Sequence, residues 1–142
     1  MQNYHIPVDF KSLYTGQKLP KSSVSKSVIR HIYLMLMTNH GECGYNKYYG
    51  SKLWDSDFDL GITTGNWTQE IEATLVQTIR TYEPRIHPDF GLKVLIEKVM
   101  GEDEKNQKQK FSVAVDKLRL KETNEKIDDI DFSIVFSPIS IE

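Results

Sequence analysis

The sequence has 142 residues, in which 18 Lys and Arg stand against 20 Asp and Glu, and its formal net charge is −2. A chain of this length is typical of one domain, and folding removes about 68–70% of its surface from water. The weak net charge excludes a field that could by itself hold nucleic acid or an anionic membrane. We therefore expect a protein partner and no nucleic acid.

The N-terminus lacks the basic, apolar and small-residue progression of a signal peptide, and no apolar run reaches the about 20 residues that span a bilayer. The single cysteine, Cys43, cannot form an internal disulfide. Together these features predict a cytoplasmic protein without direct membrane insertion.

Residues 1–21 are expected to form an irregular N-terminal arm, and residues 22–142 a single α+β domain. Apolar residues in the arm follow neither a helical nor a strand period, although Ile6–Phe10 favours an extended stretch. Such an arm becomes ordered only when its apolar residues find a surface. It is either a contact element or a frayed terminus.

A first helix is predicted from Ser22 or Ser23, one of which is the N-cap, to about Asn39, with Gly41 as a left-handed residue beyond its end. Its core stripe recurs at three- and four-residue steps: Val24, Val28, Ile32, Met35 and Leu36. Three further apolar residues lie off this stripe: Tyr33, Leu34 and Met37. This second apolar face is covered either by a partner or by the arm or a strand.

No metal or cofactor site is predicted. His31, at the edge of the stripe, and His40, at the helix end, lack further ligands at compatible spacing. All four histidines are interpreted as surface or boundary residues: His5, His31, His40 and His87. Cys43 has no histidine and base around it in the sequence, so we do not expect a nucleophile.

The glycine-rich segment Gly41–Gly65 is interpreted as a structured loop. Its expected anchors are the apolar residues Leu53, Trp54, Phe58 and Leu60. The acidic residues between them are expected to face water: Asp55, Asp57 and Asp59.

A second helix is predicted from Asn66, as N-cap, to a stop at Pro84, with Gln69 as the capping-box partner. Its buried face consists of Trp67, Ile71, Leu75, Ile79 and Tyr82. Pro84 disfavours the α conformation at Glu83, so the chain turns at a rigid corner, Glu83-Pro84-Arg85. Without further context, this corner is a helix end with an exposed ion pair, which contributes about 0–1 kcal/mol.

Beyond the corner the apolar period changes to two. Three strands are predicted: Leu92–Met100, Phe111–Val115 continuing toward Leu120, and Ile130–Phe136. The hydrophilic loops Glu102–Lys110 and Lys121–Lys126 join them as an antiparallel meander. The predicted fold class is therefore α+β, with two amphipathic helices packed on a C-terminal three-stranded meander and room for extra short strands.

Several of these segments together resemble a known family. They are the Thr38…Gly41-Glu42 turn, the Gly-Ser-x-Leu-Trp segment at residues 50–54, and the Glu83-Pro84-Arg85 corner after a helix. In this order, from about Ser22 to the end, the chain resembles the contractile-tail baseplate wedge family, which includes the TssE subunit of type VI secretion. It departs from the family at Cys43, where the family usually has arginine.

The resemblance implies a structural subunit, not an enzyme, that joins the wedge core of a contractile injection apparatus to the first sheath ring. Its partners would be TssF-like and TssG-like wedge proteins and sheath subunits resembling TssB and TssC. Glu83, Pro84 and Arg85 would bind the wedge core. An uncharged segment near a sheet edge would template the sheath by strand addition: Ser133, Ile134, Val135 and Phe136.

Two alternatives remain. Proteins resembling this family have been labelled tail lysozymes, and glycoside hydrolysis needs two carboxylates about 5–5.5 Å or 6.5–9.5 Å apart, one with a raised pKa. The candidates are Glu83 and one of Asp55, Asp57 or Asp59. Because Arg85 would lower the pKa of Glu83, hydrolysis is disfavoured and no catalytic residue is assigned. A regulatory anti-adaptor of the same fold would not need the corner.

Overall fold

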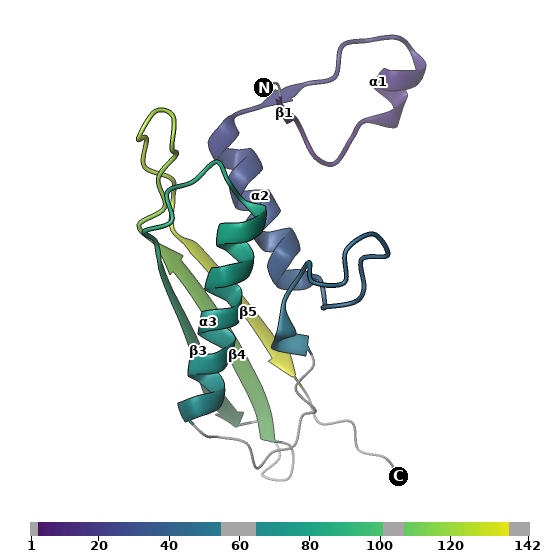
Figure 1. Cartoon of the computed structure of the whole chain (residues 1–142). Coiled ribbons are helices and arrows are strands. Elements are labelled where there is room, and N and C mark those ends of the chain that lie inside the picture. The colour runs from purple at the N-terminus through teal and green to yellow at the C-terminus, as the bar shows by residue number, and fades with distance from the viewer. Residues whose placement is uncertain (1–2, 55–64, 101–106, 137–142) are drawn as a thin grey trace, which may run out of the picture.

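The computed structural model describes residues 3–54, 65–100 and 107–136. Figure 1 shows two long helices side by side on one face of a three-stranded sheet, with the N-terminal arm projecting beyond them. The elements are β1 (Asn3–Tyr4), α1 (Phe10–Tyr14), β2 (Lys21–Ser22), α2 (Val24–Met37), a 3₁₀ turn (Lys52–Trp54), α3 (Gly65–Tyr82), β3 (Gly91–Met100), β4 (Gln107–Asp116) and β5 (Ile130–Phe136). The α+β class and the meander are confirmed.

The sheet has the antiparallel order β3-β4-β5, so β3 and β5 are its edges. Strand β4 begins four residues earlier than predicted, because the polar residues 107–110 continue its pairing with β3 as far as Met100 opposite Gln107. It also ends earlier than the predicted continuation. Lys117 adopts a φ of 57°, which turns the chain, and Leu118 and Leu120 reach the core from the loop.

Helix α2 has the predicted N-cap, since the Ser23 hydroxyl accepts from the Lys26 amide at 3.3 Å. Its end comes two residues before the predicted Asn39, because Thr38 is already extended. Four of the five predicted stripe residues are buried, whereas Val24 is 38% exposed. The helix thus contributes Val28, Ile32, Met35 and Leu36 to the core.

Helix α3 includes Gly65, so Asn66 is not its N-cap and that prediction is wrong. Its core residues are Ile71, Leu75 and Ile79, while Tyr82 is half-buried. The helix ends before Pro84 as predicted, and its last turn closes with the Glu83 amide donating to the Ile79 carbonyl at 2.9 Å. The side chains of β3, β4 and β5 complete this core: Val94, Phe111, Val113, Val115 and Ile130.

The loop after α2 is fastened to the helix end by the Gly-Ser pair. Gly50 has a φ of +108°, and a Cβ at this position would lie 2.5 Å from the Thr38 carbonyl oxygen. The buried Ser51 donates its amide to that oxygen at 2.7 Å, and its hydroxyl accepts from the Leu53 amide at 2.9 Å. In the described part of this loop, residues 41–54, a structured segment anchored by Leu53 is confirmed. The expected anchors Phe58 and Leu60 and the three aspartates lie outside the described residues.

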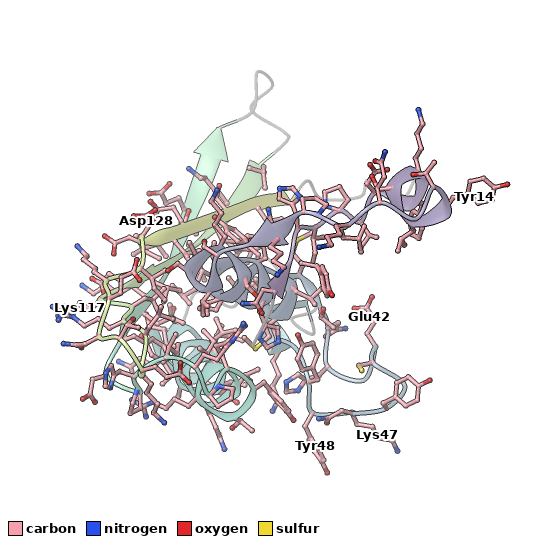
Figure 2. The ribbon with its side chains drawn as sticks, turned by 90° about the horizontal axis from the view of Figure 1, so that it is seen from above. Tyr14, Glu42, Lys47, Tyr48, Lys117 and Asp128 are labelled. Atoms are coloured by element: carbon pink, nitrogen blue, oxygen red, sulfur yellow. The ribbon has the colours of Figure 1, made fainter. Side chains whose placement is uncertain are left out.

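The N-terminal arm is more regular than predicted. Strands β1 and β2 pair antiparallel, and Asp9 caps helix α1 by accepting from the Lys11 and Ser12 amides. The stretch Ile6–Phe10 is not a strand, because Asp9 starts a helix there instead. Figure 2 shows Tyr14 at the tip of the arm, away from the body, with Lys117 and Asp128 on the opposite side.

Candidate functional site

The carboxylate of Glu83 is fully enclosed, with 0% of its side chain exposed, at the point where α3 ends. Arg85 donates from Nε to Oε1 and from Nη2 to Oε2, each at 2.7 Å, so the pair is bidentate. The Arg85 amide also donates to Oε1 at 3.3 Å. The corner is therefore an internal ion pair and not the exposed one that the isolated motif suggests.

Helix α2 supplies the remaining partners. His31 Nδ1 lies 2.7 Å from Glu83 Oε2 and, since a carboxylate only accepts, it is the donor. Ser27, one turn earlier on α2, accepts from Arg85 Nη1 at 3.0 Å. Sequence reasoning missed both residues. Their four-residue spacing was the available signal, because it puts them on one face of the helix.

Aromatic side chains pack beside the hydrogen bonds that join Glu83, Arg85, His31 and Ser27. The His31 ring stacks on Tyr49 with centroids 6.0 Å apart, and Tyr49 meets Tyr82 edge to face at 5.2 Å. Asn46 donates to the Tyr82 hydroxyl at 2.9 Å. The site thus joins α2, the loop after it and the end of α3.

The pKa of Glu83 reflects this enclosure. Burial acts to raise it, but the hydrogen bonds from Arg85 and His31, and then their charges, lower the pKa to about 2. The pKa of Arg85 is raised, chiefly by its hydrogen bonds to Glu83. The expected lowering by Arg85 is confirmed. A buried carboxylate that stays ionised at neutral pH does not fit the role of a general acid.

The outer part of the corner borders a hollow of the surface. Pro84 is exposed, and 26% of the Arg85 side chain is exposed. The hollow is lined by Val24, Pro84, Arg85, Leu120, Glu122 and Thr123. The Lys121 amide donates to the Arg85 carbonyl at 2.8 Å, which holds the loop after β4 beside the corner.

The second predicted site lies on edge strand β5. Ser133 and Val135 are exposed, Val135 by 52%, whereas Ile134 is half-buried against the core. Phe136 is the last residue of the strand. The Tyr33 hydroxyl donates to the Asp131 carbonyl at 3.1 Å, so α2 covers the start of this edge.

Within the described ranges, no three His, Cys, Asp or Glu side chains gather as metal ligands would. None of the helices in the same ranges combines the length and the hydropathy needed to cross a bilayer.

Two solved structures are similar to this chain. A candidate tail lysozyme from Geobacter sulfurreducens shares 19% identity at a TM-score of 0.45, over 82% of this chain and 92% of that one. A chain of the baseplate complex from the type VI secretion system shares 15% identity at a TM-score of 0.43, over 80% and 93%. No curated protein matches the sequence significantly.

The family comparison covers more than half of the chain. The profile of the family described as baseplate wedge protein gp25 matches residues 22–125, from the last residue of β2 to the loop before β5. The matched range contains the Gly-Ser pair and the Glu83-Pro84-Arg85 corner. The chain therefore belongs to the gp25 family of baseplate wedge proteins.

Proposed function

We propose that this protein is the TssE-like baseplate subunit of a contractile injection apparatus of the type VI secretion kind, joining the wedge core to the first sheath ring. Family membership supports a structural role in a baseplate. The observation that carries the proposal is the corner, where a buried carboxylate holds an arginine at the surface in one orientation.

The wedge core is the proposed partner of this corner. Pro84 and Arg85 offer the contact, while Glu83 has no exposed side chain and acts by positioning Arg85. A guanidinium held at both Nε and Nη2 loses little freedom when a partner docks, so less binding energy is lost to ordering. Desolvated charge pairs at interfaces show coupling energies of about 1.5–7 kcal/mol. TssF-like and TssG-like wedge proteins are the partners we propose.

The sheath is the proposed partner of β5, through addition of a strand from a TssB-like or TssC-like subunit to residues 133–136. In this role the protein would act in the cytoplasm, at the base of an envelope-anchored apparatus, without catalysis. The lowered pKa and full burial of Glu83 support a role without hydrolysis.

A matched pair of substitutions tests the wedge contact without touching the ion pair. Glu122 and Glu125 are both exposed in one loop, but only Glu122 lines the hollow beside Pro84 and Arg85. Glu122→Arg fills the hollow and adds a charge of the same sign as Arg85. We expect it to abolish co-purification with co-expressed TssF-like and TssG-like proteins, while Glu125→Arg co-purifies normally.

Melting temperatures of both variants should match that of the wild type. Equal co-purification of the two variants would contradict the wedge contact at this hollow. Arg85→Ala is the less suitable variant, because it also leaves the buried Glu83 carboxylate without its bidentate partner.

A further inference from the structure

A groove on the other side of Arg85 is lined by apolar side chains that nothing in the described chain covers. Leu34 and Met37, on α2, are 55% and 61% exposed, and Ile6, on the arm, is 60% exposed. Tyr33 differs from them, because it packs edge to face on Phe132 of β5. The sheet therefore covers one of the three apolar residues that lie off the core stripe of α2 and leaves two.

The polar rim of this groove has an unused donor. Arg30 Nη1 is buried and has no hydrogen-bond partner among the described residues, while Nη2 lies 3.4 Å from His5 Nε2. The groove is also lined by His31 and Arg85, and by no carboxylate of the described chain. Glu83, which those two residues bind, is already fully engaged. Among the described residues, therefore, Arg30 has no carboxylate acceptor beside it.

We propose that this groove seats an amphipathic helix of a partner protein, whose apolar face covers Ile6, Leu34 and Met37 and whose Asp or Glu side chain accepts from Arg30. A helix carries apolar residues at three- and four-residue steps with an acidic residue beside them, which fits an apolar floor with a cationic rim. The proposal concerns the isolated chain and does not depend on a role in a baseplate.

Charge argues against a second copy of this chain as the occupant. The arm holds several of the exposed apolar side chains that a second copy could offer, and it carries Lys11, Lys18 and Lys21. Its one acidic residue, Asp9, is used as an N-cap and accepts from the Ser12 hydroxyl at 2.6 Å. An excess of lysines would meet Arg30 and Arg85 with the same sign of charge.

The experiment selects helical peptides from a phage-displayed library against the full chain and measures their affinity by fluorescence anisotropy. We expect the selected peptides to carry Asp or Glu next to a helical apolar stripe. Arg30→Glu should weaken their binding about tenfold or more, whereas Lys93→Glu, an exposed charge reversal on β3, should not. Arg30→Gln, which removes the charge but keeps a donor for His5, should weaken binding as well.

The apolar floor has its own matched control. Leu34→Ser should lower the affinity, and Leu95→Ser, at a β3 position that is 56% exposed, should leave it unchanged. Failure to select any binder, or binders without an acidic residue that tolerate Arg30→Glu, would overturn the proposal. Sedimentation of the wild type as a dimer that Leu34→Ser dissociates would assign the groove to a second copy and overturn it too.

Discussion

Glu83 carries a charge that the fold has taken out of water. Removing an ionised carboxylate from water is costly, and two hydrogen bonds from the Arg85 guanidinium, one from its amide and one from His31 offset this cost. The three residues come from α2 and from both sides of Pro84, so the ion pair fixes the angle between the helix end and the chain beyond it. We infer that the corner acts as a structural brace, with Pro84 exposed and Arg85 partly exposed on its outer side.

We predict that Glu83→Gln destabilises the isolated protein by about 3 kcal/mol, the lower end of the range for breaking a buried ion pair, because Arg85 and His31 keep partial access to water. Urea unfolding measures the free energy of unfolding. Glu97→Gln, at an exposed position of β3, is the control and should change it little. A loss as small as that of the control would mean that the ion pair does not brace the fold.

The stabilisation that Glu83 provides should also depend on pH. Because folding lowers the pKa of Glu83 from 4.5 to about 2, its contribution of about 3 kcal/mol is complete above about pH 5 and is lost as the pH falls through this interval. The difference in free energy of unfolding between the wild type and Glu83→Gln should therefore be constant near neutrality and shrink below about pH 4.5. A difference that stays constant down to pH 3 would contradict the assigned pKa.

Gly50 is required for a different reason. We predict that Gly50→Ala lowers the free energy of unfolding by about 1–3 kcal/mol, because alanine is strained at a φ of +108° and its Cβ would collide with the Thr38 carbonyl. Gly41 also has a positive φ, of +82°, but no atom lies within 4 Å of its Cβ position, so Gly41→Ala isolates the cost of the backbone conformation. Equal losses in the two variants would show that the collision contributes nothing.

Strand β5 has a covered beginning and an open remainder. The Asp131 carbonyl accepts from Tyr33, which indicates that the backbone groups of Asp131 face away from β4. Backbone groups alternate sides along an antiparallel strand, so those of Ser133 and Val135 face away as well, and those of Ile134 face β4. The open edge therefore offers the amides of Ser133 and Val135 to another chain.

Proline substitutions at two neighbouring positions of β5 distinguish the outward-facing amides from the amides that hydrogen-bond to β4. Ser133→Pro removes an outward donor and should block sheath polymerisation in cells while the baseplate still assembles and the melting temperature changes little. Ile134→Pro removes a donor to β4 and should destabilise the protein by about 3 kcal/mol or more. Fluorescence microscopy of a tagged sheath subunit is the measurement. Sheaths of normal length with folded Ser133→Pro protein would exclude strand addition at this edge.

The sequence was most informative where local pattern and burial agree. The apolar stripes of α2 and α3 and the apolar alternation of β3 and β5 placed most of the core correctly. The reason is that the positions of apolar residues in the sequence directly mark the side chains that are buried. Residues 107–110 were misassigned to a loop, because a polar strand extension that pairs with β3 beyond the core has no apolar alternation to report. Asn66 failed as N-cap because helix ends are the least constrained by a periodic pattern.

The candidate site was predictable only in part. Glu83, Pro84 and Arg85 form one local motif, so their turn could be read from Pro84 alone. His31 lies 52 positions from Glu83, and their contact depends on how α2 packs against α3, which no local pattern specifies. The environment of Arg30 could not be predicted from the sequence either, since the burial of its unpaired Nη1 becomes evident only in the folded structure.

The arm and the domain should behave as separable parts of the molecule. In α1 no residue is buried, and Phe10 and Tyr14 are 77% and 94% exposed, so the arm beyond its strand pair adds little to the core (Figure 1). We predict that replacing residues 6–19 by an Asn-Gly turn, which keeps the β1–β2 pair, shifts the melting temperature by less than about 4 °C, the effect of about 1 kcal/mol at this size.

The same variant should lose incorporation into the baseplate, because an exposed apolar tip that adds little to the stability of the described chain is suited to contact another protein. Co-purification with the wedge and sheath proteins measures this. A variant with Phe10→Ser and Tyr14→Ser in the full-length chain is the control for arm length, and normal incorporation of both variants would show that the arm is dispensable.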